Sequence, residues 1–559
     1  MNALIILLLG ALGIVVGYGY YGRRIDKSII QPDDSKATPA KMFMDGVDFT
    51  PAGRSVLFGY QFKSIAALGP IGGPIVAAQW GWLPALLWII FGTLFIGWAH
   101  DYASIIVPMR SDGDTFGALS YKLISPRARS ILLVFIYLYL LLIMGAFGQV
   151  IGINFMTNPA VPFGILSVIL MGLLAGQMIY KMKQDIILTS VVTVAISFFG
   201  IWLGQTPAIT NIFANFNSAL GDNVKYVWPI ITMLICYLGA VLPIWRWAQP
   251  TNYVSFWIIA LGMVGGVIGL LIWHPSIGDF PAYTGWTVTG LGPLWPVLFV
   301  TIACGAISGW HSLVSSSGTA RQIEKESDAL PIGAGAMWME MALAVISLLT
   351  ATAATGGWDA YKEAFASGKF GVFAIGLAEF LSHIGIPTSF GVPYGMVFLT
   401  IMGLTIMYLV VRFMRVASAE FLGGSIPIMK NIHVGAIVAL ILSLIVIWTG
   451  VWQTIWVLFG GANQMMASLA LLIVTIWLMN NGKKYSWTFW PFIFMYFTTL
   501  AALGYTGYNA LKAAFAGSNV TGNYIAGGFA IILIICALIL GYDGAKVLSA
   551  KGKPTAETG

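Results

Sequence analysis

The sequence predicts an all-α polytopic membrane protein, and its composition carries the prediction. Of the 559 residues, 58% are hydrophobic and only 9% are charged. A soluble domain carries about 25% charged residues, so an ordinary water-exposed surface is excluded. The mean hydropathy is +0.86. The 65 glycines agree with this class, because glycine is more frequent in transmembrane helices than in soluble ones. We therefore expect the function to be exercised in or across a lipid bilayer.

About fifteen segments are apolar enough to cross a bilayer, since a span needs roughly 20 apolar residues. The expected spans cover residues 2–21, 63–79, 82–108, 129–152, 160–180, 186–204, 226–246, 252–273, 293–316, 333–356, 391–413, 432–450, 454–479, 487–510 and 523–541. The segment 371–386 is apolar but short and bounded by glycine and proline. We expect a re-entrant or surface helix there.

The basic residues predict the orientation of these spans. With the N-terminus outside, nearly all of the 28 Lys and Arg residues, Lys63 among them, fall on the inner side. The residues expected in outside loops are Lys225, Lys362, Lys369 and Lys512. Cytoplasmic loops are enriched in Lys and Arg, so we expect the N-terminus outside and the C-terminus in the cytoplasm. The net charge of +7 thus marks the inner face and indicates no nucleic-acid partner.

The chain divides into four parts around a repeated core. We expect an extra N-terminal helix and a cytoplasmic loop at 1–62, followed by a first five-helix repeat at 63–204. A second five-helix repeat at 205–413 contains the outer loop 357–390, and four extra helices with a tail occupy 414–559. The first set of five spans begins inside and the second begins outside. Two units of opposite orientation are typical of inverted-repeat transporters.

The first helix of each repeat contains residues that interrupt a helix. The first carries Gly69-Pro70-Ile71-Gly72-Gly73-Pro74, and the second runs from Gly239 through Pro243 to Trp245. Proline donates no backbone hydrogen bond and glycine relaxes the backbone, so amides and carbonyls are freed at mid-depth. Such groups are costly in hydrocarbon unless they line a cavity or meet a partner. Helix ends can hold a carboxylate or a cation; a plain proline kink is the alternative.

Small residues, hydroxyls and one imidazole recur through span 293–316. The residues at steps of three and four are Thr301, Gly305, Ser308, His311 or Ser312, and Ser315. This spacing places them on one face of a continuous helix. Such a face suits a cavity wall, and close helix packing by small residues is the alternative. His311 is a candidate proton carrier, because the reference pKa of histidine lies near physiological pH.

Three carboxylates lie in or beside apolar runs, namely Asp101, Glu340 and Glu379. A charge at the centre of a membrane helix costs about 2.5–3.5 kcal/mol, so each needs a partner or water. Asp101 and Glu340 lie towards the inner ends of their spans, where a cytoplasmic vestibule or an ion pair is the alternative to a role in coupling. Glu379 and His383 are expected to form a local pair on the outer side.

The sequence contains no motif of an ATPase, a zinc protease or an α/β-hydrolase: G-x-x-x-x-G-K-[ST], H-E-x-x-H and G-x-S-x-G are all absent. We therefore expect neither an enzyme nor a cofactor.

The three cysteines lie far apart in apolar runs, which indicates packing residues and no metal spacing; they are Cys236, Cys304 and Cys536. Amides near outer helix ends cap helices or line an outer vestibule; they are Gln79, Gln149 and Asn154.

Several stretches between residues 46 and 480 resemble the carbon starvation protein A (CstA) family. They are Gly46 to Phe62, Gly69 to Gly81, Cys304 to His311, Ser315 to Thr319 and Leu458 to Gln464. The resemblance implies a nutrient transporter of the bacterial inner membrane that is induced by carbon starvation. It implies peptides or pyruvate as substrates, protons or sodium as coupling ions, and a LeuT-type inverted repeat.

The resemblance also implies a site, because in that fold two broken helices and an eighth core helix hold substrate and cation. We expect a substrate carboxylate at amides freed near Gly72 and Gly73. The expected substrate-binding residues are Gly69, Pro70, Gly72, Gly73, Pro74, Gly239, Pro243, Trp245, Ser308 and His311. The residues expected to handle a sodium ion or a proton are Ala66, Gly69, Ser312, Ser315, Ser316, His311, Asp101 and Glu340. No metal other than sodium is expected.

One position departs from the family pattern, which often has Arg-Asp after Gln-Pro. Here Gln249-Pro250 is followed by Thr251-Asn252, and Arg246 is the nearest replacement for the missing charge.

Two other functions remain as alternatives. A channel would need a ring of charges or a carbonyl-filter motif, neither of which the sequence contains. A membrane starvation sensor would need an output domain, for which the short loops leave little room.

Overall fold

The computed structural model describes residues 1–46, 48–368 and 370–551. Lys369 lies outside this part of the chain, and so do residues 552–559 of the expected tail. One antiparallel hairpin joins β1 (Thr287–Val288) to β2 (Gly292–Pro293). The helices are α1 (Leu4–Ile14), α2 (Arg23–Ile25), α3 (Pro39–Met42), α4 (Arg54–Ile65), α5 (Gly69–Ala77), α6 (Trp82–Gly92), α7 (Trp98–Met109), α8 (Phe116–Leu123), α9 (Pro126–Gly148), α10 (Pro162–Gly176), α11 (Ile186–Leu203), α12 (Pro207–Leu220), α13 (Val224–Val241), α14 (Ala248–Trp273), α15 (Phe299–Thr301), α16 (Gly309–Ser317), α17 (Gly335–Thr352), α18 (Trp358–Gly368), α19 (Gly371–Ser382), α20 (Thr388–Leu422), α21 (Ile432–Ile447), α22 (Trp452–Asn480), α23 (Ser486–Phe515) and α24 (Val520–Lys551).

Twelve helical segments of the described chain are long and apolar enough to cross a membrane. The protein is therefore a multi-pass membrane protein. Three of the fifteen expected spans are built differently. The chain is interrupted within 63–79 and within 293–316, and 432–450 holds the 16-residue α21. Proline, glycine and small polar residues at the two interruptions account for the first two differences.

The short apolar segment expected at 371–386 forms α19, which has 12 residues. It packs between longer helices through glycines that allow close approach. Gly391 and Gly395 of α20 face Ala378 and Ala374, and Gly269 of α14 meets the backbone of Phe380. A side chain at any of these glycines would collide with α19, so α19 is a buried packing element.

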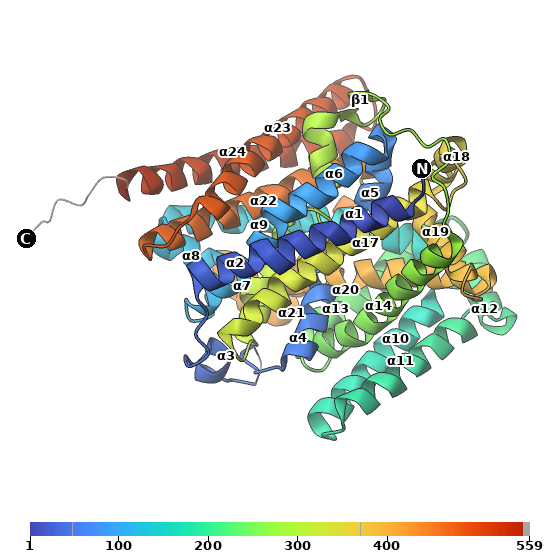
Figure 1. Cartoon of the computed structure of the whole chain (residues 1–559), viewed down its shortest axis with the longest axis horizontal. Coiled ribbons are helices and arrows are strands. Elements are labelled where there is room, and N and C mark those ends of the chain that lie inside the picture. Colours follow the sequence, from blue (N-terminus) through green and yellow to red (C-terminus); the bar gives the residue numbers. More distant parts are fainter. Residues whose placement is uncertain (47, 369, 552–559) are drawn as a thin grey trace, which may run out of the picture.

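The helices run roughly alongside one another, with α10 and α11 at one edge and α23 and α24 at the opposite edge (Figure 1). The helix over 454–480 lies between them and is buried over most of its length. The hairpin and α18 lie at one end of the bundle, whereas α2 and α3 lie at the other (Figure 1). This arrangement places the two interrupted helices near the centre of the protein, where their polar groups are shielded from lipid.

Candidate functional site

The first interruption separates α4 from α5. The helix α4 ends at Ile65, Ala66 has an extended backbone, and α5 begins at Gly69. Residues 59–78 are all buried. Pro70 follows the first residue of α5, a place where proline fits because a helix leaves its first amides without intrahelical partners. The prolines therefore start a second half-helix here and do not merely kink one span.

The second interruption lies within the expected span 293–316 and corrects the prediction of one continuous helical face there. Helical structure stops after Thr301, residues 302–308 are non-helical, and α16 begins at Gly309. Thr301 and His311 therefore belong to different half-helices. Gly305 and Ser308 lie in the connection, where steps of three and four no longer define a shared face.

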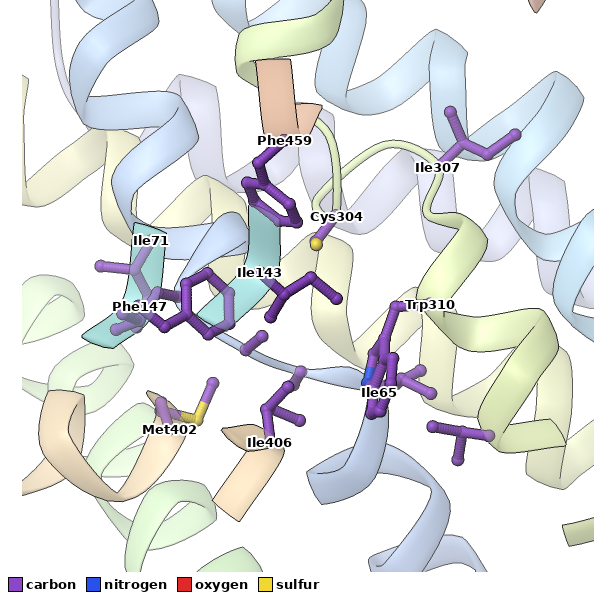
Figure 2. Packing of buried hydrophobic residues seen from close by; sticks show 14 of the residues in the cluster. Ile65, Ile71, Ile143, Phe147, Cys304, Ile307, Trp310, Met402, Ile406 and Phe459 are labelled. Atoms are coloured by element: carbon purple, nitrogen blue, oxygen red, sulfur yellow. The ribbon is translucent and has the colours of Figure 1, made fainter. Parts of the chain in front are cut away.

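The two interruptions pack directly against each other. A Cβ atom on Gly69 would lie 2.5 Å from Sγ of Cys304, and one on Gly73 would lie 2.7 Å from the carbonyl oxygen of Thr301. Glycine at 69 and 73 thus permits a contact that any other residue would prevent. Figure 2 shows Ile65 beside Trp310 and Cys304 nearby in this region. The protein therefore has a crossing of two broken helices, which we call the helix crossing (residues 65–73 and 301–311).

The predicted second break does not join this crossing. Gly239 lies near the end of α13, and residues 242–247 connect α13 to α14, so Pro243 and Trp245 lie between two successive spans. Gly239 packs on Tyr408, where a Cβ would lie 2.6 Å from that side chain. Trp245 contacts Tyr180, with ring centroids 5.9 Å apart. The Gly-Pro pattern here ends a helix; it does not interrupt a span.

Side chains from neighbouring helices satisfy the freed backbone groups. Trp88 Nε1 donates to the carbonyl oxygens of Phe299 and Ile302 at 2.9 and 3.3 Å. Gln464 Nε2 donates to the same two oxygens at 2.8 and 3.2 Å. The adjacent Asn463 accepts from the Trp310 amide at 3.0 Å. Because unpaired backbone groups are costly in a low-dielectric interior, these three side chains stabilise the interruption.

Three of the predicted coupling residues meet beside the helix crossing. Nδ1 of His311 lies 2.7 Å from Oδ2 of Asp101, and Nε2 lies 3.1 Å from Oε2 of Glu340. The neighbouring His100 contributes Nδ1 at 2.8 Å from Oδ1 of Asp101. All four side chains are fully buried. The predicted alternatives to a coupling role were a cytoplasmic vestibule or an ion pair, and both carboxylates pair with His311 in the buried interior.

Cys304 adds a thiol to this cluster. The ligand-type atoms of Cys304, His311 and Glu340 all lie within 4.8 Å of one another. The spacing of the cysteines in the sequence indicated no metal site, because the partners of Cys304 come from α16 and α17 and not from a second cysteine. These three residues are the ones at the helix crossing that could hold a metal ion.

Lys63 is buried at the end of α4, whereas the positive-inside rule predicts a position in a loop on the inner side. Its Nζ donates to Oγ1 of Thr405 at 2.5 Å and to the carbonyl oxygen of Ala66 at 3.5 Å. The ammonium therefore occupies the position beside the Ala66 carbonyl at which a coupling cation was expected.

The serines expected to bind a cation have protein partners. Ser312 Oγ donates to the carbonyl oxygen of Gly309 at 2.7 Å, and Ser316 Oγ donates to that of Ser312 at 2.7 Å. Ser315 Oγ accepts from Gln61 Nε2 at 3.0 Å. Such bonds within a helix turn are typical of buried hydroxyls. In this conformation the serines tie α16 together and link it to α4.

The amides of Gly72 and Gly73 do not lie free. The Gly72 amide donates to Leu68 at 2.8 Å within the first turn of α5. A Cβ on Gly72 would lie 2.3 Å from Cε1 of Phe370 and 3.2 Å from Trp456. The carboxylate site expected at these amides is thus filled by aromatic side chains in this conformation.

A cavity of about 1030 Å³ lies on the other side of this aromatic contact. Phe370 belongs to its lining, together with the amides of Gln79, Gln149 and Asn154, for which the sequence analysis offered a vestibule as one interpretation. Residues 289–291 of the hairpin also line it, which places the cavity at the hairpin end of the bundle (Figure 1). Phe370 therefore separates this cavity from the helix crossing.

Polar contacts close the opposite end of the protein. Arg110 Nη2 lies 2.7 Å from Oε2 of Glu326, and its Nε lies 3.1 Å from Oε1. The amide and hydroxyl of Ser327 donate to Asp34 at 2.9 and 2.7 Å. These hydrogen bonds lower the pKa of Asp34. A further ion pair joins Arg54 to Asp328. We call Asp34, Arg110, Glu326 and Ser327 the inner clasp.

Comparison with known families identifies the family of the chain. The family described as Carbon starvation protein CstA matches residues 2–366 and 357–502. The chain belongs to the CstA family. The matched residues include both broken helices, the inner clasp and Asn463-Gln464.

Curated relatives of this CstA family member are transporters by name. The peptide transporter CstA of Bacillus subtilis (strain 168) is 28% identical over 591 residues, which cover 97% of this chain and 96% of that protein. The peptide transporter CstA of Escherichia coli (strain K12) is 28% identical, covering 87% and 78%. The pyruvate/proton symporter BtsT of the same organism is 26% identical, covering 88% and 80%.

Solved structures offer weaker likenesses. A manganese transporter of Eremococcus coleocola aligns with a TM-score of 0.45 at 14% identity, over 90% of this chain and 99% of that one. MhsT in complex with L-phenylalanine aligns with a TM-score of 0.44 at 12% identity, over 88% and 99%. Scores below 0.5 do not establish a shared fold.

Sequence reasoning missed several residues of the site. Lys63 was predicted to be an inner-side charge, although it lies only six residues before Gly69, within the same apolar run. His100 and Cys304 had no recognisable spacing. Asn463 and Gln464 stood within a motif that resembles the CstA family, but their role as partners of a freed backbone becomes evident only from the hydrogen bonds of Gln464 and Asn463.

Proposed function

We propose that this CstA family member is a secondary active transporter that imports small peptides or a small carboxylate such as pyruvate across the bacterial inner membrane during carbon starvation. The substrate classes are those in the names of its relatives, peptide transporter CstA and the pyruvate/proton symporter BtsT. The observation that carries the proposal is the helix crossing, because discontinuous helices at mid-depth are where transporters place substrate and coupling ions.

Coupling to protons is favoured over coupling to sodium by the position of Lys63. Its ammonium is fully buried and contacts Thr405 and the Ala66 carbonyl. A sodium ion at the same carbonyl would face this positive charge in a low-dielectric interior, where repulsion is strong. A buried lysine can instead take up and give up a proton. We infer that Lys63 is the coupling residue and that Glu340 provides the opposing charge.

The open cavity at one end of the protein and the closed clasp at the other support a mechanism of alternating access. The hairpin-end cavity is large enough for a drug-sized molecule, since ligand pockets measure about 300–1,000 Å³. It reaches Phe370, and the inner clasp closes the other end. We propose that the cavity faces the periplasm and the clasp faces the cytoplasm, in agreement with the distribution of basic residues. Import then requires Phe370 to leave Gly72 and the clasp to open afterwards.

Uptake into proteoliposomes tests the proposal. Pyruvate and a dipeptide serve as probes, and the pH gradient and the sodium gradient are imposed separately. A transporter accumulates one probe above its outside concentration when the driving gradient is present. Flux that only equilibrates the probe would identify a channel, and binding without any flux would identify a sensor; either result would overturn the proposal.

A further inference from the structure

The helix crossing brings together three side chains that bind transition metals. Cys304 lies in the second interruption, His311 on α16 and Glu340 on α17, and all three are fully buried. The thiol sulfur, an imidazole nitrogen and a carboxylate oxygen lie within 4.8 Å of one another. A tetrahedral zinc ion with bonds of about 2.0–2.3 Å spaces its ligands by roughly 3.3–3.8 Å. Small rotations of these side chains would therefore close the site.

The polar atoms that point into this space have no hydrogen-bond partner within the part of the chain that the structure describes. They are Oε1 and Oε2 of Glu340 and Nε2 of His311. Nε2 of His311 and Oε2 of Glu340 lie 3.1 Å apart, which is an ion-pair contact, but neither atom forms a hydrogen bond with a described residue. Buried polar groups are almost always paired, and an unpaired carboxylate is especially costly. A cation between these atoms would supply the missing partner.

The surrounding residues orient His311 as they do in known metal sites. Metal-binding histidines usually present one ring nitrogen to the ion and bond a carboxylate through the other. Here Nδ1 of His311 bonds Asp101 at 2.7 Å, which leaves Nε2 directed towards Glu340. His100 holds Asp101 in turn at 2.8 Å. Gly69 packs directly on Cys304, so the thiol is fixed on the remaining side.

The charges of the cluster also match a divalent ion. Asp101, Glu340 and a Cys304 thiolate carry three negative charges, and Lys63 carries one positive charge. A divalent cation cancels the remainder, which a low-dielectric site requires. The mixture of sulfur, nitrogen and oxygen ligands suits Zn²⁺ and excludes Mg²⁺ and Ca²⁺, which take oxygen ligands.

We propose that Cys304, His311 and Glu340 bind one divalent transition-metal ion, Zn²⁺ by the chemistry of the donors. The ion would tie the second helix interruption to α16 and α17. Three protein ligands leave a fourth coordination position open, as in zinc sites that accept water or a substrate oxygen. This inference goes beyond the proposed transport function, since metal binding can be measured in protein that moves no substrate.

The metal content of the full-length protein tests the inference. Protein purified in detergent is treated with a chelator and then reloaded with Zn²⁺ or Co²⁺, with Mg²⁺ as the negative control. We expect one tightly held Zn²⁺ per chain by elemental analysis, and a thiolate-to-cobalt charge-transfer band in the Co²⁺ form. The proposal would be overturned if the wild-type protein failed to hold an ion after removal of the excess. A cobalt spectrum of the wild type without sulfur ligation would also overturn it.

Matched cysteine variants locate the ion. Cys304→Ala removes the proposed ligand, whereas Cys236→Ala removes a buried cysteine of α13 that lies elsewhere. We expect Cys304→Ala and Glu340→Gln to weaken Zn²⁺ binding by roughly ten-fold or more. Cys304→Ala should also abolish the cobalt–sulfur band, and Cys236→Ala should change neither property. If Cys236→Ala has the effect and Cys304→Ala does not, the ion lies elsewhere and the assignment is wrong.

Discussion

The carboxylate of Asp101 lies 2.7 Å from Nδ1 of His311, and both side chains are fully buried. This contact joins α7 to α16 next to the helix crossing. It fixes the imidazole ring so that the opposite nitrogen is directed at Glu340. A paired charge in such a place is tolerated because both partners are present, and removal of one partner from a buried pair typically costs about 3–5 kcal/mol.

Replacement of Asp101 should therefore destabilise the protein, and the effect should be larger when both acceptor oxygens are removed than when one remains. Asp101→Ala leaves His311 and His100 without their acceptor, and we expect a loss of about 3–5 kcal/mol. Asp101→Asn keeps one acceptor oxygen, so the loss should be smaller, about 1.5–3 kcal/mol for a bond to a charged group. Unfolding in detergent measures both variants. Asp359→Asn, at a carboxylate with 90% side-chain exposure, is the control. Equal stability of all three variants would contradict the role of the pair.

The aromatic contact between Phe370 and Gly72 makes a second prediction. An alanine at 72 would place a methyl group 2.3 Å from Cε1 of Phe370, so the ring must move. We expect Gly72→Ala to reduce uptake at least ten-fold, since the hairpin-end cavity and the helix crossing meet at the ring of Phe370. The double variant Gly72→Ala with Phe370→Ala should recover part of the uptake because the collision is removed. Gly528→Ala, where a Cβ meets nothing within 4 Å, is the matched control. No recovery in the double variant would count against this barrier.

The inner clasp should control access from the other end. Glu326→Gln removes the charge that Arg110 contacts through two nitrogen atoms, so the closed inner end should be destabilised. We expect faster labelling of Cys304 by a small maleimide in inside-out vesicles, measured with Cys236 and Cys536 replaced by alanine. Glu324→Gln, at a half-buried carboxylate two residues away, is the control. Unchanged labelling would show that the clasp does not govern this access.

A pH dependence of the clasp follows from Asp34, whose pKa is lowered by hydrogen bonds from Ser327. A carboxyl group with a depressed pKa stabilises the bonded state at pH values above its ordinary range. This contribution is lost as the pH falls through the depressed pKa. The unfolding temperature in detergent should accordingly fall in acid, and Asp34→Asn should remove that part of the pH dependence. A wild-type pH profile that Asp34→Asn reproduces unchanged would contradict this assignment.

Composition and hydropathy were sufficient to predict an all-α membrane protein, because the cost of burying backbone polar groups in lipid leaves few alternatives. A break near Gly69 to Pro74 was predictable because proline and glycine act locally, and it lies just before them, at residues 66–68. The break at 302–308 was not predictable. It contains no proline, and it depends on Trp88, Asn463 and Gln464, which are distant in sequence.

The candidate site was only partly predictable. His311, Asp101 and Glu340 stood out individually as ionisable residues in apolar segments, but their proximity depends on how α7, α16 and α17 pack. Lys63 was misplaced because the positive-inside rule counts charges near span ends without regard to burial. Gly239 and Pro243 were assigned to a break because a helix end and a helix interruption have the same local sequence signature.

The central claim is that a proton on Lys63 couples substrate movement at the helix crossing. It is tested most directly by pyruvate or dipeptide uptake into proteoliposomes under an inward pH gradient, for the wild type and Lys63→Met, with Lys430→Met at an exposed lysine as the control. We expect accumulation above equilibrium with the wild type and Lys430→Met. Lys63→Met should exchange labelled substrate but should not accumulate it. Accumulation by Lys63→Met under the pH gradient, or by the wild type under a sodium gradient alone, would contradict the claim.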